Sequence, residues 1–319
     1  MKLRLIAIFL ALLLLLPIYA MAEDDADYIK WVEFNVSYSA LTAALDYDLT
    51  TYGTDTHLNW IELLAVLGAR YGGEFSKYKK SHLDDLTAKL QTGEKIGDIT
   101  SELENYDYYH EAYSAILGEF VGQHRVAGED CYGLKVFSPI AAGFGYSHFD
   151  DFGAGRNYGY RRRHLGHDMF GAVGTPIIAI ESGVVEVMGW NQYGGWRIGI
   201  RSFDGLRYYY YAHLRQNRPF HPDVQEGSVV RAGDVIGYMG RTGYSQKENT
   251  NGIRETHLHW GMQLIFHPDQ KEGPKEIWVD VYPITRLLQR NQSETYRVAE
   301  TKEFYTKHEF DEPNLFGKG

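Results

Sequence analysis

The feature that most constrains the fold is a change in sequence pattern near residue 135. Before it, apolar residues recur at the three-to-four spacing that is typical of amphipathic helices, for example over residues 41–49. After it, short apolar runs alternate with glycine-containing turns. The sequence therefore predicts an α+β protein, with an all-α region over residues 23–134 and an all-β, mostly antiparallel region over residues 135–288.

One hairpin stands out within the β-rich half. The runs WRIGIRSF and LRYYYYAHL are separated by Asp204-Gly205, a dipeptide that favours a type I′ turn. Within this half, no run before Ile284 predicts a long helix. Residues 289–319 are polar and charged, and we expect them to form a tail that packs loosely across the surface or is mobile.

The first 22 residues have the pattern of a signal peptide. Lys2 and Arg4 precede an apolar run over residues 5–16, and Ala20-Met21-Ala22 places small residues where a signal peptidase reads them. We expect residues 1–22 to be cleaved, leaving a protein of the cell envelope or the extracellular space without stable membrane insertion. An uncleaved anchor is the alternative, because the apolar sequence approaches the roughly 20 residues of a spanning helix.

Charge and cysteine content argue against several classes of function. The formal net charge is −10 at pH 7, whereas a nucleic-acid partner would need a basic surface. Cys131 is the single cysteine, so we expect a small buried residue rather than a nucleophile or half of an internal disulfide. Neither His110-Glu111 nor His308-Glu309 continues into an HExxH zinc motif, and no GxSxG elbow is present.

Two short motifs place candidate metal ligands together. In THLHW, His257 and His259 lie two residues apart on a predicted strand, so they project from the same face. In HLGHD, His164 and Asp168 would lie roughly 13 Å apart on a straight strand. A bend at Gly166 would bring both side chains round one point.

A third motif, YAHL, contains His213 at the end of an alternating run. Tyr209, Tyr211 and His213 would share one face of this strand, with Tyr208 and Tyr210 on the other. Whether His213 belongs to the same site depends on the fold. Nitrogen and carboxylate ligands at about 2.0–2.2 Å suit Zn²⁺, and three protein ligands leave the open position that a catalytic zinc needs.

The order of these motifs resembles a known family. HLGHD, GTPIIA, YAHL, GSVVRAGDVIGYMGRTG and HLHW follow one another as in the lysostaphin/LytM-type zinc peptidases, peptidase family M23, and the match covers roughly residues 137–266. The resemblance implies a lysostaphin-type (duplicated hybrid motif) domain. It also implies one Zn²⁺ per chain, held by His164, Asp168 and His259.

The resemblance also implies a catalytic pair and a substrate. His213 and His257 would be the unligated histidines beside the metal, and one would act as base and acid while the other stabilises the oxyanion, in either assignment. His167 falls at the variable position of its motif, so we expect it either to contact the metal ligands without binding the metal or to lie on the surface. The implied reaction is hydrolysis of peptide cross-links of bacterial peptidoglycan by zinc-activated water.

Several residues outside the motifs bear on the substrate. The loop QKENTNGIRE after Ser245 replaces a short small-residue loop of the family, and Gly261 stands where the family often has an acidic residue, so cleft shape and specificity are open. We expect Arg161–Arg163 to be solvated, with contact to substrate carboxylates as the alternative. Four aromatic residues are candidates for a substrate groove, with ordinary strand packing as the alternative: Trp190, Tyr193, Tyr211 and Tyr244.

Two other functions stay open. One is a catalytically silent LytM-type scaffold or activator of other cell-wall hydrolases, although this chain retains all five residues of the site. The other is a latent enzyme whose cleft is blocked by residues 23–134 until they are removed.

Overall fold

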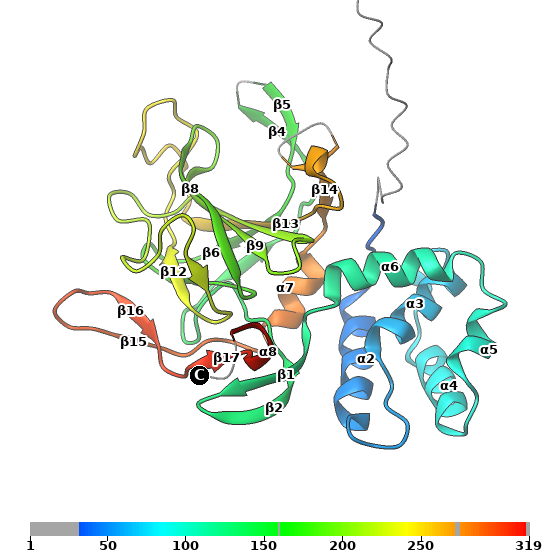
Figure 1. Ribbon diagram of the computed structural model, residues 1–319. Helices are drawn as coiled ribbons and strands as arrows, with labels where there is room; N and C mark the ends of the chain where they lie inside the picture. The colour runs from blue at the N-terminus through cyan, green and yellow to red at the C-terminus, as the bar shows by residue number, and fades with distance from the viewer. Residues whose placement is uncertain (1–31, 159, 272–274, 317–319) are drawn as a thin grey trace, which may run out of the picture.

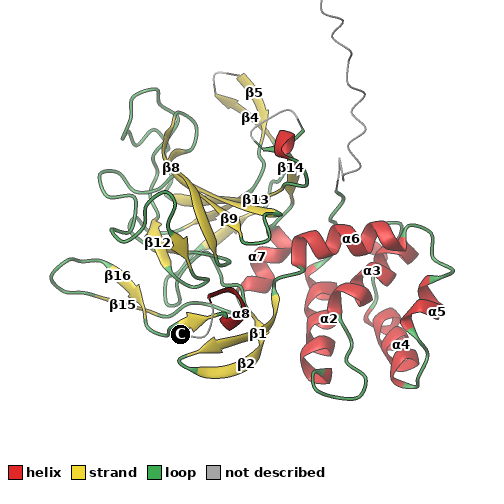
Figure 2. Cartoon of the chain, in the orientation of Figure 1, coloured by secondary structure: helices red, strands yellow, loops and turns green. Residues whose placement is uncertain are grey.

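The computed structural model describes residues 32–158, 160–271 and 275–316, so the predicted signal peptide lies outside the described residues. The N-terminal helices gather on one side of the molecule and most of the strands on the other (Figures 1 and 2). This is the α+β arrangement that the sequence predicts. Among the described residues, each helix is too short or too polar to pass through a lipid bilayer.

The helical part packs around one almost fully apolar helix. Its α-helices are α2 (Tyr38–Thr51), α3 (Trp60–Tyr71), α4 (Lys80–Gln91), α5 (Ile96–Thr100) and α6 (Tyr106–Leu117). The side chain of Asn59 caps α3 by accepting hydrogen bonds from the backbone N–H groups of Ile61 and Glu62. Gly72 ends the helix with a left-handed φ of +62°. Most of the residues between these caps are buried, so α3 forms the centre of this unit.

The helices end earlier than the sequence analysis predicts. Residues 118–134 are not helical, because β1 (Val121–Val126) and β2 (Glu129–Leu134) form a hairpin there. Its two-residue turn is Ala127-Gly128, and both residues have positive φ, +52° and +83°, as a type I′ turn requires. Cys131 lies on β2 and is exposed, so the expectation of a small buried residue is wrong.

The large sheet holds the strands that carry the histidine motifs. Its order is β11-β8-β9-β10-β13-β6-β3, with β14 paired to β13, and all these pairs are antiparallel. The strands are β3 (Ser147–Phe149), β6 (His167–Phe170), β8 (Gly183–Asn191), β9 (Gly195–Ser202), β10 (Arg207–Ala212), β11 (Val229–Val230), β13 (His257–Leu264) and β14 (Ile277–Val279). A mostly antiparallel β region follows the helices, as predicted.

The hairpin of β9 and β10 is present, with a different turn from the one predicted. Of the dipeptide Asp204-Gly205, only the glycine has a positive φ, +76°, whereas a type I′ turn needs both. The carboxylate of Asp204 accepts hydrogen bonds from the Ser202 hydroxyl and the Leu206 N–H, which holds the loop in its observed form.

The C-terminal segment is integrated into the fold by short strands. The smaller two-stranded sheets are β4 (Gly155–Tyr158) with β5 (Tyr160–Arg163), β7 (Pro176–Ile178) with β12 (Val235–Tyr238), and β15 (Thr295–Arg297) with β16 (Phe304–Thr306). After helix α7 (Tyr282–Leu288), the chain returns to β17 (Phe310–Asp311), which pairs with β1, and ends in the short helix α8 (Pro313–Phe316). The tail therefore adds a strand to the hairpin that precedes the large sheet.

One buried arginine connects the helical part to the large sheet. Arg207, at the start of β10, has no exposed surface. Its Nε and Nη2 donate to the two carboxylate oxygens of Glu181 at 2.8 and 3.0 Å, and its Nη1 donates to the carbonyl oxygen of Ala115 in α6 at 2.8 Å. The guanidinium thus bonds both parts of the protein, out of contact with water.

Candidate metal centre

Strand register brings the motifs together across three neighbouring strands. In the pairing of β6 with β13, Asp168 lies directly opposite His259. In the pairing of β13 with β10, His259 lies opposite Ala212, the residue before His213. His257 and His259 share a face of β13, so the register alone gathers four of the candidate residues on one side of the sheet.

A bend before β6 adds His164 to this group. The residue lies between β5 and β6, and Gly166 follows it where the chain turns into β6. A Cβ on Gly166 would lie 2.6 Å from the carbonyl oxygen of Trp260 and 2.7 Å from the ring of His259, so only glycine fits at this close approach. The sequence places the bend at this residue, and the structure shows the contact that requires it.

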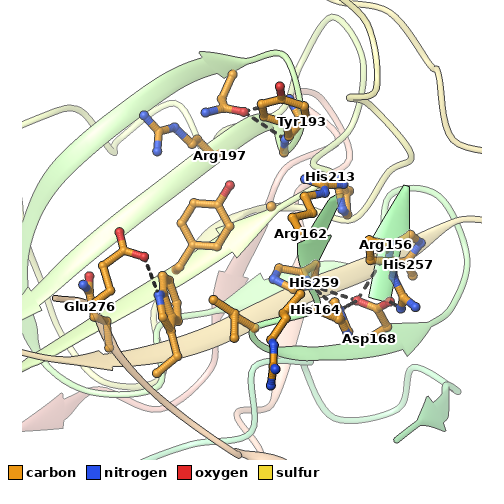
Figure 3. A pocket seen from close by; sticks show the side chains of 18 of the residues that line it. Arg156, Arg162, His164, Asp168, Tyr193, Arg197, His213, His257, His259 and Glu276 are labelled. Atoms are coloured by element: carbon orange, nitrogen blue, oxygen red, sulfur yellow. Dashed lines mark hydrogen bonds and ion pairs between the residues drawn. The ribbon is translucent and has the colours of Figure 1, made fainter. Parts of the chain in front are cut away.

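The atoms of the candidate ligands form a small triangle. His164 Nε2 lies 3.0 Å from Asp168 Oδ1 and 2.9 Å from His259 Nδ1, and the last two atoms are 2.9 Å apart (Figure 3). One proton cannot form hydrogen bonds in all three of these atom pairs, whereas one metal cation can contact all three atoms. Two imidazole nitrogens and one carboxylate oxygen are a donor set that Zn²⁺ accepts. These residues therefore fit a zinc ion.

Two residues that the sequence analysis missed support this triangle from behind. Asp151 Oδ1 lies 2.8 Å from His164 Nδ1, on the side of the ring that faces away from the triangle. Arg156 forms ion pairs with Asp151 at 2.5 Å and with Asp168 Oδ2 at 3.5 Å. A carboxylate on the outer nitrogen fixes the orientation and the tautomer of a ligating histidine. Their positions outside any motif gave no sequence signal for this role.

The other two histidines line the pocket beside the triangle. The ring centroids of His213 and His257 are 4.7 Å apart, and His257 Nε2 lies 3.9 Å from Asp168 Oδ1. Their Nδ1 atoms each lie 3.0 Å from a backbone carbonyl oxygen, that of Thr242 and that of Glu255 respectively. An Nδ1–H that donates to a carbonyl leaves Nε2 unprotonated in a neutral ring.

Burial and mutual contacts set the charge of the site. Burial acts to raise the pKa of Asp168, but hydrogen bonds with His164 and His259 outweigh it and hold that pKa well below its usual range. Burial lowers the pKa of His259, and burial with the neighbouring His257 holds the pKa of His213 well below its usual range. At neutral pH, Asp168 is therefore a carboxylate and the rings of His259 and His213 are neutral. These are the protonation states that metal ligation requires of Asp168 and His259.

Comparison with known proteins agrees with the motifs. The family model described as peptidase family M23 matches residues 162–271, which span β5 to β13. Residues 162–271 belong to peptidase family M23. The chain is 35% identical over 201 residues to the L-Ala–D-Glu endopeptidase of Bacillus subtilis, an alignment that covers 63% of this chain and 58% of that relative.

Two further proteins are similar to parts of the chain. Lysostaphin of Staphylococcus simulans is 42% identical over 83 residues, which cover 26% of this chain and 16% of lysostaphin. The chain thus spans less than two thirds of the length of either relative. A crystal structure from Ruminococcus gnavus, provisionally assigned as a glycyl-glycine endopeptidase lytM, aligns with a TM-score of 0.55 and 26% identity over 81% of this chain and 89% of that one.

The M23 domain forms a pocket of about 440 Å³ around the candidate centre. Of the predicted groove residues, Tyr193 and Tyr244 line it, whereas Tyr211 and Trp190 do not. Tyr211 is fully buried on the opposite face of β10, where its hydroxyl oxygen accepts a hydrogen bond from the Ile180 N–H. Trp190 packs edge-on against a neighbouring tryptophan, which is the strand packing named as the alternative.

The prediction that Tyr211 lines the substrate groove is wrong because of the backbone conformation just after β10. Tyr208, Tyr210 and Ala212 line the pocket of the M23 domain, so the opposite face of β10 is the functional one. His213 joins that face because its φ of +62° breaks the strand alternation just after β10 ends. A left-handed non-glycine residue is uncommon and has no signature in the alternating sequence.

His167 and Gly261 complete the comparison with the motifs. His167 is buried and points away from the M23 pocket, and its Nε2 lies 2.8 Å from His148 Nδ1. It is therefore not a surface residue, which was one of the two expectations.

Gly261 lies beneath Trp278, and a Cβ there would be 2.9 Å from the indole ring. Trp278 lines the pocket beside Gly261, the position at which the family often has an acidic residue.

Proposed function

We propose that the chain is an exported zinc metalloendopeptidase that hydrolyses peptide cross-links of bacterial peptidoglycan. The observation that carries this proposal is the convergence of His164, Asp168 and His259 in a pocket that also contains His213 and His257. The M23 match supports it, and so do two relatives that are named as an L-Ala–D-Glu endopeptidase and lysostaphin.

Three residues would hold one zinc ion per chain: His164, Asp168 and His259. The metal would supply Lewis-acid chemistry there and lower the pKa of water towards neutrality. Asp168 would bind the metal through Oδ1, which faces His164, while its Oδ2 pairs with Arg156. Asp151 would orient the ring of His164 by its charge, since its Oδ1 lies 2.8 Å from Nδ1 without the angles of a hydrogen bond, and Nε2 faces the other two ligands.

The proposed catalytic pair is His213 and His257. The carbonyl contacts on their Nδ1 atoms leave each Nε2 available in the pocket. One Nε2 can take a proton from the attacking water, and the same ring can then donate that proton to the leaving amine. The Nε2 of the second ring can donate a hydrogen bond to the oxyanion of the peptide carbonyl only after that ring has itself taken up a proton during the reaction.

Location and partners belong to the same proposal. Residues 1–22 are proposed to direct export, which would bring the enzyme to peptidoglycan peptides in the cell envelope or outside the cell. The pocket-lining residues lie between Arg156 and Trp278, so in the described part of the chain the helices α2 to α6 contribute none of them. This placement gives no support to a cleft blocked by residues 23–134.

The test is digestion of purified cell-wall sacculi with different cross-links, in the presence of zinc or of a chelator. We expect peptide fragments that are released with zinc, not released with chelator, and restored when zinc is added back. The masses of the fragments identify the bond. A protein that binds zinc and releases nothing from any wall would instead be a catalytically silent scaffold or activator, and the proposal would be wrong.

A further inference from the structure

Arg162 lies inside the pocket rather than in solvent. It belongs to β5, and its guanidinium carbon lies 4.8 Å from the ring centroid of Tyr193 and 4.9 Å from that of Tyr244. The two tyrosines come from distant segments, the β8–β9 turn and the loop after β12. In the view of Figure 3, Arg162 lies between His213 and His259, and all three residues line the same pocket. For this residue, the expectation of a solvated side chain is wrong.

Part of the hydrogen-bonding capacity of this arginine is not met by the residues that the structure describes. Among the described residues, Arg162 forms no ion pair, and its buried Nε has no hydrogen-bond partner. Arg156 in the same pocket is different, because Asp151 and Asp168 neutralise it. A buried N–H without a partner is costly, so a guanidinium held in this way is suited to a ligand that supplies acceptors.

The two tyrosines are held in place for this contact. Tyr244 has a φ of +48°, a left-handed conformation that costs a non-glycine residue free energy and clusters at ligand sites. The backbone N–H of Tyr193 donates to Asn191 Oδ1 at 2.7 Å, which fixes the turn. Aromatic faces hold the flat sides of a guanidinium and leave its N–H edge free to bind a carboxylate through two parallel hydrogen bonds.

The charge of the pocket selects the same kind of ligand. Of the residues that the structure describes, four arginines and two acidic residues, Asp168 and Glu276, line it, and Asp151 beside Arg156 adds a third negative charge. Asp168 faces the other candidate metal ligands, and Glu276 is exposed and accepts a hydrogen bond from the indole N–H of Trp278. The pocket is therefore positively charged before any metal binds, which favours an acidic peptide over a neutral one.

We propose that Arg162 binds a free carboxylate of the substrate, so that the pocket takes acidic stem peptides in preference to neutral glycine bridges. This inference rests on the proposed function, since it names the class of peptide that the same site accepts. Stem peptides can offer such a carboxylate on the γ-linked D-glutamyl residue or on the diamino acid that follows. Both sources present the same planar group to the guanidinium.

The first test is equilibrium binding to the full chain loaded with zinc. The probes are N-methylated, uncleavable stem peptides, either with both carboxylates free or amidated at the glutamyl or at the diamino-acid position, and pentaglycine. We expect the free peptide to bind about tenfold to a hundredfold more tightly than one of the two amides, which identifies the carboxylate. Equal affinity for all the peptides, or a preference for pentaglycine, would overturn the inference.

Variants assign this preference to one side chain. Arg162→Gln should bind the free and amidated peptides equally, and Arg162→Lys should recover part of the preference, because an ammonium keeps the charge without the planar fork. The matched control is Arg297→Gln, which removes an arginine that also lies over an aromatic ring, Phe304, outside the pocket. A preference that survives in folded, zinc-loaded Arg162→Gln would contradict the assignment.

Cleavage of the same peptides without N-methyl groups separates the two proposals. If the free peptide is cleaved, Arg162→Gln should raise its KM with little change in kcat, and the KM of the amidated peptide should not change. If no peptide and no wall is cleaved, the proposed function fails, while the binding preference still decides what Arg162 recognises.

Discussion

At the scale of single residues, the site depends on contacts behind the reactive atoms. Asp151 faces the outer nitrogen of His164, and carbonyl oxygens face the outer nitrogens of His213 and His257. Each ring is thereby fixed in orientation, with its inner nitrogen directed at the pocket. This arrangement lets three histidines present lone pairs at one place without being protonated there.

The contact from Asp151 gives a prediction for metal affinity. Asp151→Asn keeps the size of the side chain and removes the charge that orients His164, so zinc affinity should fall about tenfold to a hundredfold. Competition with a chelator of known affinity measures this. The control is Asp150→Asn, which changes the exposed neighbouring aspartate. Unchanged affinity in Asp151→Asn would mean that the carboxylate does not orient the ring.

Residue patterns predicted which side chains meet, but not all of their surroundings. The spacing of HLGHD was enough to bring His164 to Asp168 through one glycine bend, and strand alternation placed His257 and His259 on one face. The choice of His259 as the third member of the set came from the resemblance to the M23 family, and the structure brings these three residues together. Alternation failed at Tyr211, since the positive φ of His213 reverses the face just after the strand. Arg162 needs two tyrosines from distant loops, and no local pattern indicates them.

At the scale of elements, the site depends on the turn from β5 into β6 fitting closely against β13. Gly166 contacts both the backbone of Trp260 and the ring of His259. The position of the bend follows from the sequence. The register that sets Asp168 opposite His259 does not, because it results from packing of the whole sheet.

Filling this contact should disturb the metal centre. In Gly166→Ala, the added Cβ would overlap the His259 ring, so we expect a loss of about 1–3 kcal/mol in the free energy of unfolding and weaker zinc binding. Denaturant unfolding and zinc titration measure the two effects. Gly155→Ala on β4 is the control, since a Cβ there meets nothing within 4 Å. If both variants behave alike, the close approach does not constrain the site.

At the scale of the whole molecule, the helical part is a structural partner of the large sheet. Arg207 bonds Glu181 and the carbonyl of Ala115, so one buried charge spans the two parts. The sequence predicted helices followed by strands, but not this contact, because it joins residues 92 positions apart. The hairpin at 121–134 was also missed, since its Ala-Gly turn is a weaker signal than Asn-Gly.

Removal of this charge should destabilise the protein as a whole. Arg207→Met leaves Glu181 buried without its partner, so we expect a loss of about 3–5 kcal/mol in the free energy of unfolding. Chemical denaturation of the full chain measures it. Arg125→Met removes an exposed ion pair with Asp130 and should cost at most about 1 kcal/mol. A similar small loss in both variants would show that Arg207 does not connect the two parts.

The most direct measurement for the central claim follows zinc content and the release of new amino groups from sacculi in the same samples. The unaltered protein should bind one zinc ion and release amino groups. His259→Ala should lose both properties, whereas His213→Ala should keep its zinc and lose roughly a hundredfold or more in rate. Undiminished release by His259→Ala, or by His213→Ala, would contradict the account of a zinc centre with a histidine pair beside it.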